Sequence, residues 1–291
     1  MATSGDVCRL CGGATEPQFH RLVLGRHQVQ YARCRSCGSL QTEPPFWLAE
    51  AYGSPLATGD TGAVQRCLST RAAVWLILAL LGMRSCRLVD FGGGTGLLCR
   101  MLRDAGIDAW TSDRYGRGDF AQGFRVDPDA LAPGRFEVVT AFEVFEHLPD
   151  PALDLARLFA LRPRLLIAST LPYTPDRGSD WWYLSPEEGQ HVFFYSPDGL
   201  ARVARTHGYH PLSVGAWHLF LAEPAGPVRR ALLRLALRGR VLRLARLLME
   251  ILPADRHVAA DHRVRPPFPD PVPDPGDRPD PGRSAGDPPC R

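Results

Sequence analysis

Short apolar runs alternate with amphipathic stretches over residues 84–224, and this pattern predicts a parallel α/β domain. Bounded apolar runs indicate buried strands, whereas apolar positions three or four residues apart indicate helices. The expected strands are 87–91, 107–112, 136–142, 165–170, 210–214 and 217–222, and the expected helices are 97–105, 151–161 and 197–207. Strands that alternate with helices favour a mostly parallel sheet with both faces covered.

Leucine and arginine are mixed in residues 228–252, which follow the last expected strand. The arginines fall on two different helical faces and Gly239 separates them, so we expect two short helices. The favoured interpretation is that they pack on the core or on a partner chain, and the alternative is weak peripheral contact with a membrane. The longest apolar run, 72–83, is shorter than the roughly 18–20 residues that cross a bilayer, so it predicts a core helix and no transmembrane segment.

Changes in composition divide the chain into five predicted regions. Ten of the last 28 residues are proline, which is typical of a disordered tail. The regions are a zinc-binding knuckle (1–45), a helical connector (46–83), the α/β domain (84–224), Arg/Leu-rich helices (225–262) and a proline-rich tail (263–291).

The overall composition narrows the classes of partner. The chain has 291 residues, 45% of them hydrophobic, which suits one sizeable α/β domain with appendages. All 34 basic residues are arginine, and 31 acidic residues leave a formal net charge of +3, so a nucleic-acid partner is not favoured. The N-terminus shows no secretory signal pattern, and we therefore expect a cytoplasmic protein with reduced cysteines.

Two C-x-x-C elements near the N-terminus predict a structural zinc site. Four thiolates from two such turns can close a tetrahedral shell around Zn²⁺. A module of this size buries too little apolar surface to fold alone, so a metal would replace the missing core. The alternative is a set of free thiols. The predicted ligands are Cys8, Cys11, Cys34 and Cys37.

A glycine-rich turn follows the first expected strand of the α/β domain, at the sheet edge where such folds bind ligands. Its glycines, Gly92, Gly94 and Gly96, have the spacing G-x-G-x-G, and Leu97 stands where a dinucleotide-binding turn has its third glycine. Asp90, just before the turn, would repel a pyrophosphate but suits the sulfonium and amino groups of S-adenosylmethionine (SAM). The turn therefore favours SAM over a nicotinamide dinucleotide.

Residues 87–96 (RLVDFGGGTG) resemble motif I of the class I SAM-dependent methyltransferases. The resemblance extends over roughly residues 84–224. It implies a Rossmann-like sheet of seven mostly parallel strands with SAM as the cofactor. It also implies that Asp113, at the end of the second strand, accepts both ribose hydroxyls and that Asp127 faces the adenine amino group.

Two further segments are similar to the same family. Residues 143–151 (EVFEHLPDP) resemble an EHLPDP signature after the fourth strand, and residues 189–200 (GQHVFFYSPDGL) are similar to an H-x-x-F-S-P-x-x-L segment. Both place a histidine in a loop at the expected carboxyl edge, and histidine titrates near neutral pH, as a general base should. A purely structural role of these histidines is the alternative. The candidate catalytic residues are His191, His147, Glu143 and Glu146.

These features predict an enzyme that transfers a methyl group from SAM to a small-molecule or sugar acceptor, by O- or C-methylation. A cysteine-rich module before a SAM domain is similar to the arrangement in sugar C-methyltransferases. This chain departs from them in length, because those enzymes carry a substantial further C-terminal domain where it has only the Arg/Leu-rich helices and the tail. One alternative is an enzyme that modifies RNA or protein docked on the zinc knuckle and the arginines of 229–246. Another is a non-enzymatic SAM-binding scaffold. The sequence leaves the acceptor, the methylated atom and the oligomeric state open.

Overall fold

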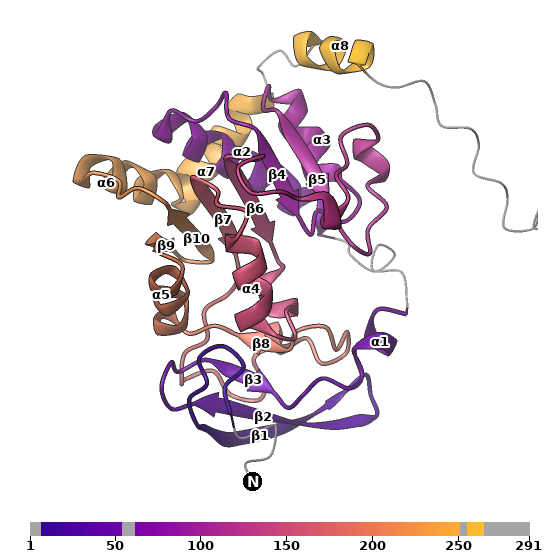
Figure 1. Ribbon diagram of the computed structural model, residues 1–291, viewed down its shortest axis with the longest axis vertical. Helices are drawn as coiled ribbons and strands as arrows, with labels where there is room; N and C mark the ends of the chain where they lie inside the picture. Colours follow the sequence, from indigo (N-terminus) through magenta and orange to yellow (C-terminus); the bar gives the residue numbers. More distant parts are fainter. Residues whose placement is uncertain (1–6, 54–61, 251–254, 265–291) are drawn as a thin grey trace, which may run out of the picture.

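The central sheet of the protein has six strands in the order β5-β4-β6-β7-β10-β9 (Figure 1). The computed structural model describes residues 7–53, 62–250 and 255–264. The pairs β5-β4, β4-β6 and β6-β7 are parallel, and β10 runs antiparallel to both β7 and β9. The strands are β4 (Leu88–Phe91), β5 (Ala109–Ser112), β6 (Val138–Phe142), β7 (Leu165–Ser169), β9 (His210–Val214) and β10 (Trp217–Leu221).

Helices cover both faces of this sheet, as the sequence pattern predicts. They are α2 (Ala63–Leu81), α3 (Leu97–Asp104), α4 (Pro151–Phe159), α5 (Pro197–Thr206) and α6 (Pro227–Ala236). Successive strand residues point to opposite faces, so Val89 and Leu166 pack with α4 and α5, whereas Leu88 and Leu165 pack with α2, α3 and α6. The predicted α/β architecture with two apolar layers is confirmed.

The expectation of seven strands was wrong by one. The segment after β5 that would supply the seventh makes a single bridge, between Arg125 and Thr111. The backbone N–H of Val126 donates to the Thr111 carbonyl at 2.9 Å. Pairing does not extend beyond this point because Pro128 has no N–H to donate. Two short 3-10 helices occupy the connection instead, η1 (Asp119–Ala121) and η2 (Pro128–Ala130).

The N-terminal module forms a second sheet, of four antiparallel strands in the order β1-β2-β3-β8 (Figure 1). Its last strand comes from the α/β domain and pairs Phe193 with Gln41 and Phe194 with Leu40. β8 begins two residues after His191, so the sheet of the N-terminal module includes the segment next to this predicted catalytic residue. The strands are β1 (Thr15–Val23), β2 (His27–Cys34), β3 (Leu40–Thr42) and β8 (Phe193–Phe194).

The connector contains a short helix, α1 (Leu48–Ala51), and the long helix α2. The apolar run 72–83 belongs to a longer helix than expected, because α2 begins at Ala63 and has 19 residues. By length and composition alone, α2 is the one helix in the described part of the chain that could cross a membrane. Its buried residues Ala73, Ile77 and Leu78 lie in the core beneath the sheet, and it contacts α3, α6 and α7 (Gly239–Glu250).

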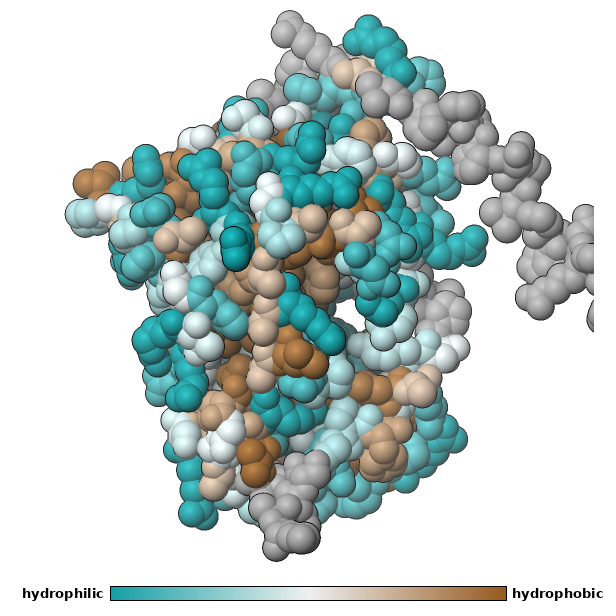
Figure 2. Space-filling model, in the orientation of Figure 1, coloured by the Kyte–Doolittle hydropathy of each residue, from teal (hydrophilic) through white to brown (hydrophobic). Residues whose placement is uncertain are grey.

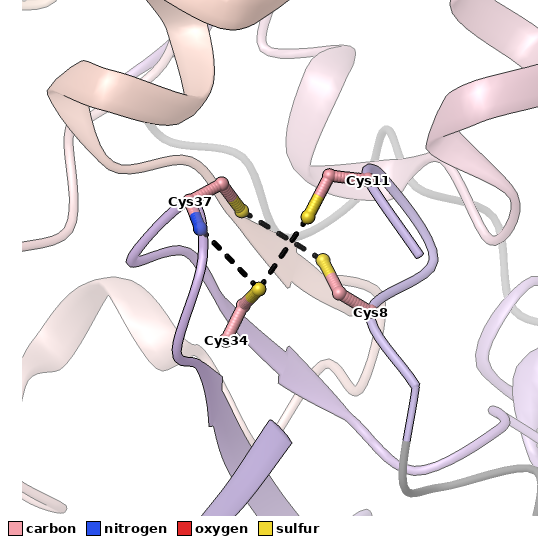
Figure 3. Close-up of side chains that lie close together, drawn as sticks. All are labelled: Cys8, Cys11, Cys34 and Cys37. Atoms are coloured by element: carbon pink, nitrogen blue, oxygen red, sulfur yellow. Dashed lines mark hydrogen bonds between the residues drawn. The ribbon is translucent and has the colours of Figure 1, made fainter. Parts of the chain in front are cut away.

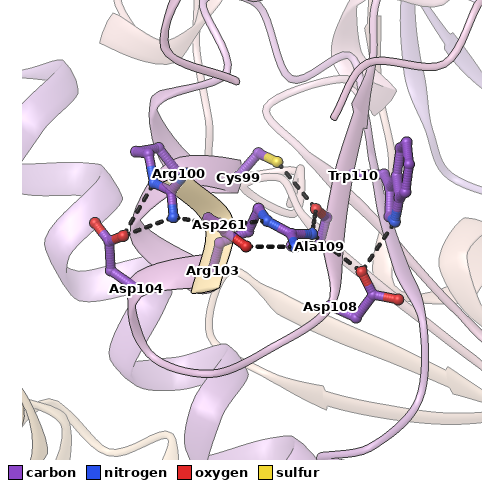
Figure 4. Close-up of polar contacts among 8 residues, drawn as sticks. All are labelled: Cys99, Arg100, Arg103, Asp104, Asp108, Ala109, Trp110 and Asp261. Carbon is purple, nitrogen blue, oxygen red and sulfur yellow. Dashed lines mark hydrogen bonds and ion pairs between the residues drawn. The ribbon is translucent and has the colours of Figure 1, made fainter. Parts of the chain in front are cut away.

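The predicted break between two helices at Gly239 is confirmed. Helix α6 ends at Ala236 with Leu237 as its C-cap, and α7 begins at Gly239. A third helix, α8 (Asp255–Val264), was not expected, because its polar sequence shows little apolar periodicity. Ion pairs attach it to α3: Asp261 accepts from Arg100 at 2.6 Å and from Arg103 at 2.7 Å (Figure 4). The predicted disordered tail lies, beyond Val264, outside the described residues.

Candidate active site and metal centre

The turn between β4 and α3 has a backbone conformation that suits glycine. Gly92, Gly94 and Gly96 have φ values of 71°, 54° and 77°, where an L side chain is strained. A Cβ on Gly92 would lie 2.6 Å from the Val144 side chain. At Gly94, by contrast, no described atom apart from its chain neighbours lies within 4 Å of the Cβ position. The turn is therefore packed against Val144 at Gly92 and open on the Cβ side of Gly94, whose N–H and C=O are paired with Asp113 and Gly118.

Two carboxylates flank this turn. Asp90, buried at the end of β4, accepts a hydrogen bond from the Thr140 hydroxyl at 2.7 Å. Burial raises the pKa of Asp90 to about 7; the Thr140 hydrogen bond opposes this rise and the charge of Asp113 adds to it. Asp113 accepts from the backbone N–H groups of Gly94 at 2.8 Å and Tyr115 at 2.7 Å, and so ties the turn to the loop after β5. A cation near both groups would favour their ionised forms.

Asp127, the third acidic residue predicted to bind the cofactor, is exposed and has a local structural role. Its side chain caps η2 by accepting the N–H of Asp129 at 2.8 Å. Contact with an adenine stays a prediction for this residue.

The residues around the glycine turn fit SAM. The hydroxyls of Thr111 and Ser112 on β5 are buried and have no hydrogen-bond partner among the residues that the structure describes. Buried polar groups without partners are costly, so a polar ligand that pairs with them is expected here. The Thr111 hydroxyl, which lies beside Gly93, the acids Asp90 and Asp113, and the open side of Gly94 match a ligand with a cationic sulfonium and a polar ribose. No spacing rule in the sequence singles out Thr111 or Ser112.

Glu146, His147 and His191 come together beside the carboxyl ends of β6 and β7. Each offers a ligand atom, and these atoms lie within 4.8 Å of one another. The first two belong to the 3-10 helix η3 (Phe145–His147), which follows β6, and the N–H of Val192 donates to the Glu146 carbonyl at 2.8 Å. The structure thus joins two segments that are 44 residues apart in the sequence. Nitrogen and oxygen atoms so arranged could also hold a divalent cation.

His191 is held in one tautomer by a backbone contact. Its Nδ1 lies 2.7 Å from the Tyr183 carbonyl oxygen, which can only accept, so Nδ1 carries the proton and Nε2 keeps a lone pair. Burial lowers the pKa of His191, while the hydrogen bond to Tyr183 and the charge of Glu143 partly offset that effect. The imidazole is therefore neutral at pH 7 and its Nε2 can accept a proton.

Glu146 is fully buried, and its Oε1 accepts from the Tyr183 hydroxyl at 2.6 Å. Its Oε2 has no hydrogen-bond partner within the described ranges. Burial, followed by the charge of Glu143, raises the pKa of Glu146 to about 8, so this carboxyl is protonated at neutral pH. Glu143 is exposed and accepts a hydrogen bond from the Ser169 hydroxyl. The carboxyl group of Glu146 is thus buried, whereas that of the nearby Glu143 is exposed.

His147 is half-buried and contacts the connector. Its Nδ1 lies 3.2 Å from the hydroxyl of Tyr52, and the Tyr52 ring stacks on Tyr115 with centroids 5.1 Å apart. Burial, followed by the charge of His191, lowers the pKa of His147 to about 3. Because a base with so low a pKa accepts protons poorly, the environment favours His191 over His147 for that role. The sequence did not single out Tyr52 or Tyr115, since their contact depends on the connector's path.

The four predicted zinc ligands form a compact cluster (Figure 3). The Sγ atoms of Cys8 and Cys37 lie 3.8 Å apart, and those of Cys11 and Cys34 lie 3.5 Å apart. A tetrahedral site with Zn–S bonds of about 2.3 Å requires sulfur–sulfur distances of about 3.8 Å. The pKa of Cys37 is lowered to about 5, first by its hydrogen bond with Cys8. The same hydrogen bond raises the pKa of Cys8, so the fit to zinc rests on the donor set and its spacing.

The cysteine cluster is linked to both histidine loops through Arg9, which lies between two of the cysteines. The guanidinium of Arg9 donates to the carbonyl of Val192 at 2.6 Å and to that of Pro149 at 2.9 Å. These residues follow His191 and His147 by one and two positions. The N-terminal module therefore supports the candidate catalytic side chains from outside the central sheet.

Comparison with known proteins agrees with this geometry. Residues 64–214 match the model of a family described as methyltransferase domain. The ubiquinone biosynthesis O-methyltransferase of Methylococcus capsulatus (strain ATCC 33009 / NCIMB 11132 / Bath) is 31% identical over 169 residues, which cover 45% of this chain and 70% of that protein. The enzyme of the same name from Bordetella parapertussis (strain 12822 / ATCC BAA-587 / NCTC 13253) is 29% identical over 150 residues, which cover 43% of this chain and 62% of that protein.

One similar solved structure is the magnesium protoporphyrin IX methyltransferase of Synechocystis PCC 6803 with bound SAH. It is 18% identical, with a TM-score of 0.43 over 60% of this chain and 90% of that one. The methyltransferase-domain model, in contrast, spans more than half of the 291 residues. This chain therefore belongs to the methyltransferase domain family and is a class I SAM-dependent methyltransferase.

Proposed function

We propose that the enzyme methylates a hydroxyl group of a small-molecule acceptor, with SAM as the methyl donor. The observation that carries this proposal is the fixed, neutral imidazole of His191, whose Nδ1 is held by the Tyr183 carbonyl. A hydroxyl nucleophile must lose its proton during methyl transfer, and Nε2 of His191 is available to accept it. SAM, when bound, supplies an electrophilic methyl carbon. The names of the two O-methyltransferase relatives support an oxygen nucleophile.

The residues of the glycine turn would hold the cofactor. Asp113 would accept hydrogen bonds from the ribose hydroxyls, and Asp90 would face the cationic methionine part. The backbone at Gly94 is open on the side where a ligand can approach. Asp127 is assigned to the adenine amino group by resemblance alone.

A phenolic hydroxyl suits this site better than an alcohol of a sugar. A phenol has a pKa of about 10, so its proton passes to a histidine far more readily than that of an aliphatic alcohol. The rings of His147, His191 and Tyr183 meet edge to face around the cluster, with centroids 4.8 Å apart in both His191 contacts. Aromatic side chains bind flat rings well. Glu146, protonated at neutral pH, would donate a hydrogen bond from its unpartnered Oε2 to the acceptor.

We also propose that Cys8, Cys11, Cys34 and Cys37 bind one structural Zn²⁺. The support is the close approach of the four sulfur atoms, all within 4.8 Å of one another and with two pairs 3.8 and 3.5 Å apart. Elemental analysis of the purified protein should find about one zinc per chain. Absence of metal from folded, active protein would contradict this part of the proposal.

The decisive experiment for the reaction is to incubate the enzyme with methyl-labelled SAM and a panel of acceptors. The panel contains catechols and simple phenols, nucleotide sugars, tRNA and a protein extract. Label in an ether carbon of a phenolic product supports the proposal, whereas label on a sugar carbon, RNA or protein overturns it. Stabilisation against heat by SAM but not by NAD is the accompanying test of the cofactor.

A further inference from the structure

Helix α6 exposes an apolar stripe that the methyltransferase site does not use. Val228, Leu232 and Leu235 are four and three residues apart and therefore lie on one helical face, and all three are exposed, Val228 at 73%. Leu233 and Leu237, on a different face, are buried in the core and fix the helix against the sheet. Figure 2 shows hydrophobic residues at the left edge of the molecule, where α6 lies in Figure 1.

Helix α7 repeats this arrangement. Leu244, Leu247 and Leu248 are three and four residues apart and exposed, Leu247 at 67%, whereas Met249 is buried. The helix contacts α2 through its other side. Two consecutive helices thus each present one apolar stripe to solvent and attach to the core by another face. Contiguous exposed apolar surface commonly marks an interaction site.

The charge of these two helices is strongly positive. Residues 227–250 contain seven arginines and a single acidic residue, Glu250, in a protein whose net charge is only +3. Arg234, Arg238, Arg240 and Arg243 are exposed. Arg240 lies on the same side of α7 as the exposed leucines, so basic and apolar groups share one surface.

A shallow cavity lies beside the α6 stripe. It has a volume of about 600 Å³ and is lined by Leu80 of α2 together with Pro227, Val228, Arg229 and Leu232. One cationic side chain at an otherwise apolar cavity matches a molecule that has an anionic group next to a hydrocarbon chain.

We propose that α6 and α7 dock this enzyme on the surface of an anionic phospholipid membrane. Arginines would pair with headgroup phosphates while the leucines enter the boundary between headgroups and acyl chains, which is how basic amphipathic helices lie on membranes. An RNA partner is disfavoured because residues 227–250 contain no aromatic side chain for base stacking. A membrane is favoured over a protein partner because seven arginines against one acidic residue give the two helices a charge of a single sign, which an anionic lipid surface attracts.

The test is binding of the full-length enzyme to vesicles. Binding to phosphatidylcholine vesicles with 30% phosphatidylglycerol and its weakening by salt support the proposal. The triple variant Arg234→Gln/Arg240→Gln/Arg243→Gln should lose about 100-fold in affinity, since each arginine near an anionic surface contributes about fivefold. The variant Leu232→Ser/Leu235→Ser/Leu244→Ser/Leu247→Ser should lose at least about tenfold.

Matched controls separate this surface from general effects. Arg26→Gln/Arg205→Gln and Leu22→Ser/Leu153→Ser change exposed residues elsewhere and should bind vesicles as the parent does. Undiminished SAM affinity shows that a variant is folded. If the leucine variant does not fold, the arginine variant still tests the proposal. The proposal would be overturned if the enzyme bound neutral vesicles as well as anionic ones, bound no vesicles, or bound RNA instead. It would also be overturned if the control variants lost as much affinity, or if the enzyme were a dimer that the leucine variant dissociates.

Discussion

The imidazole of His191 and the carbonyl group of Tyr183 are joined by a hydrogen bond of 2.7 Å, and both residues lie on the loop between β7 and β8. The same tyrosine donates its hydroxyl proton to Glu146. One residue therefore sets the tautomer of the candidate base through its main chain and contacts the protonated acid through its side chain. The candidate base His191 and the protonated acid Glu146 have pKa values shifted in opposite directions, so mutation and pH can distinguish their roles.

Replacing the candidate base should reduce turnover without affecting the cofactor. We expect His191→Ala to lower kcat by about 10²–10⁴, the usual contribution of general acid–base catalysis, while the Kd for SAM stays within about twofold. His147→Ala is the matched comparison, and because burial lowers the pKa of His147 to about 3, its loss in kcat should be smaller. The check is steady-state kinetics with the best acceptor of the panel, and a larger loss in His147→Ala would reverse the assignment.

The pH dependence of kcat/KM should reveal the same group. His191 acts only when neutral, and burial places its pKa below the ordinary histidine value of about 6.5. Activity should therefore stay constant from about pH 7 down to about 6.5 and fall at more acidic pH, whereas ionisation of Glu146 should lower it as the pH rises towards 8. The acidic limb should vanish in His191→Ala. An acidic limb with its midpoint above 7 would show that a group other than His191 is titrating.

Glu146 should make the stability of the protein depend on pH. Its pKa is about 8 when folded and about 4.5 when unfolded, so between these values the folded state binds more protons. The free energy of unfolding should therefore decrease as the pH rises through this window and level off above about 8. Urea unfolding of Glu146→Gln should show a weaker decrease between pH 6.5 and 8. Parallel curves for the two proteins would mean that Glu146 titrates as an exposed carboxyl does.

The sequence predicted the sheet well because strand and helix periodicities are local properties. The expected strand 165–170 and the observed β7 differ by one residue, and the helix break at Gly239 was correct. The seventh strand, which only the resemblance implied, does not form in the described residues for a reason that periodicity does not encode: Pro128, three residues after the single bridged residue Arg125, removes the next donor. Helix α8 was missed since its attachment depends on Asp261 meeting arginines of α3.

The candidate site could be predicted only as separate segments. Motif spacing located the glycine turn and Asp113, which directly follow β4 and β5, and two segments similar to the family located the histidines. The sequence could not show that Tyr183 connects His191 to Glu146, nor that Tyr52 reaches His147, since these contacts depend on the paths of long loops. It also gave no reason to expect β8 in the sheet of the N-terminal module.

Asp113 should contribute to cofactor affinity in two ways. It anchors the N–H of Gly94 and is the predicted acceptor of the ribose hydroxyls. Hydrogen bonds to a charged group contribute about 1.5–3 kcal/mol, so Asp113→Ala should weaken SAM binding by about 10- to 100-fold. Calorimetry measures this change, and the melting temperature checks the fold. Asp129→Ala, which removes an exposed carboxylate nearby, is the control. Unchanged affinity in Asp113→Ala would remove the residue from the site.

Loss of zinc should impair the acceptor reaction more than cofactor binding. Cys34→Ser removes one proposed ligand, and without metal the module is expected to loosen because metal binding and folding are coupled. Arg9 and the β3–β8 pair then no longer hold the loop of His191, whereas the glycine turn keeps its contacts with β5. We expect less than about 0.1 zinc per chain by mass spectrometry. The kcat/KM for the acceptor should fall at least about tenfold, which is the order of loss for groups that act by positioning others. The Kd for SAM should stay within about threefold of the parent value. Cys86→Ser, outside the cluster, should retain zinc and activity. Stoichiometric zinc in Cys34→Ser would contradict the four-thiolate site, and a metal-free variant with full activity would separate the module from catalysis.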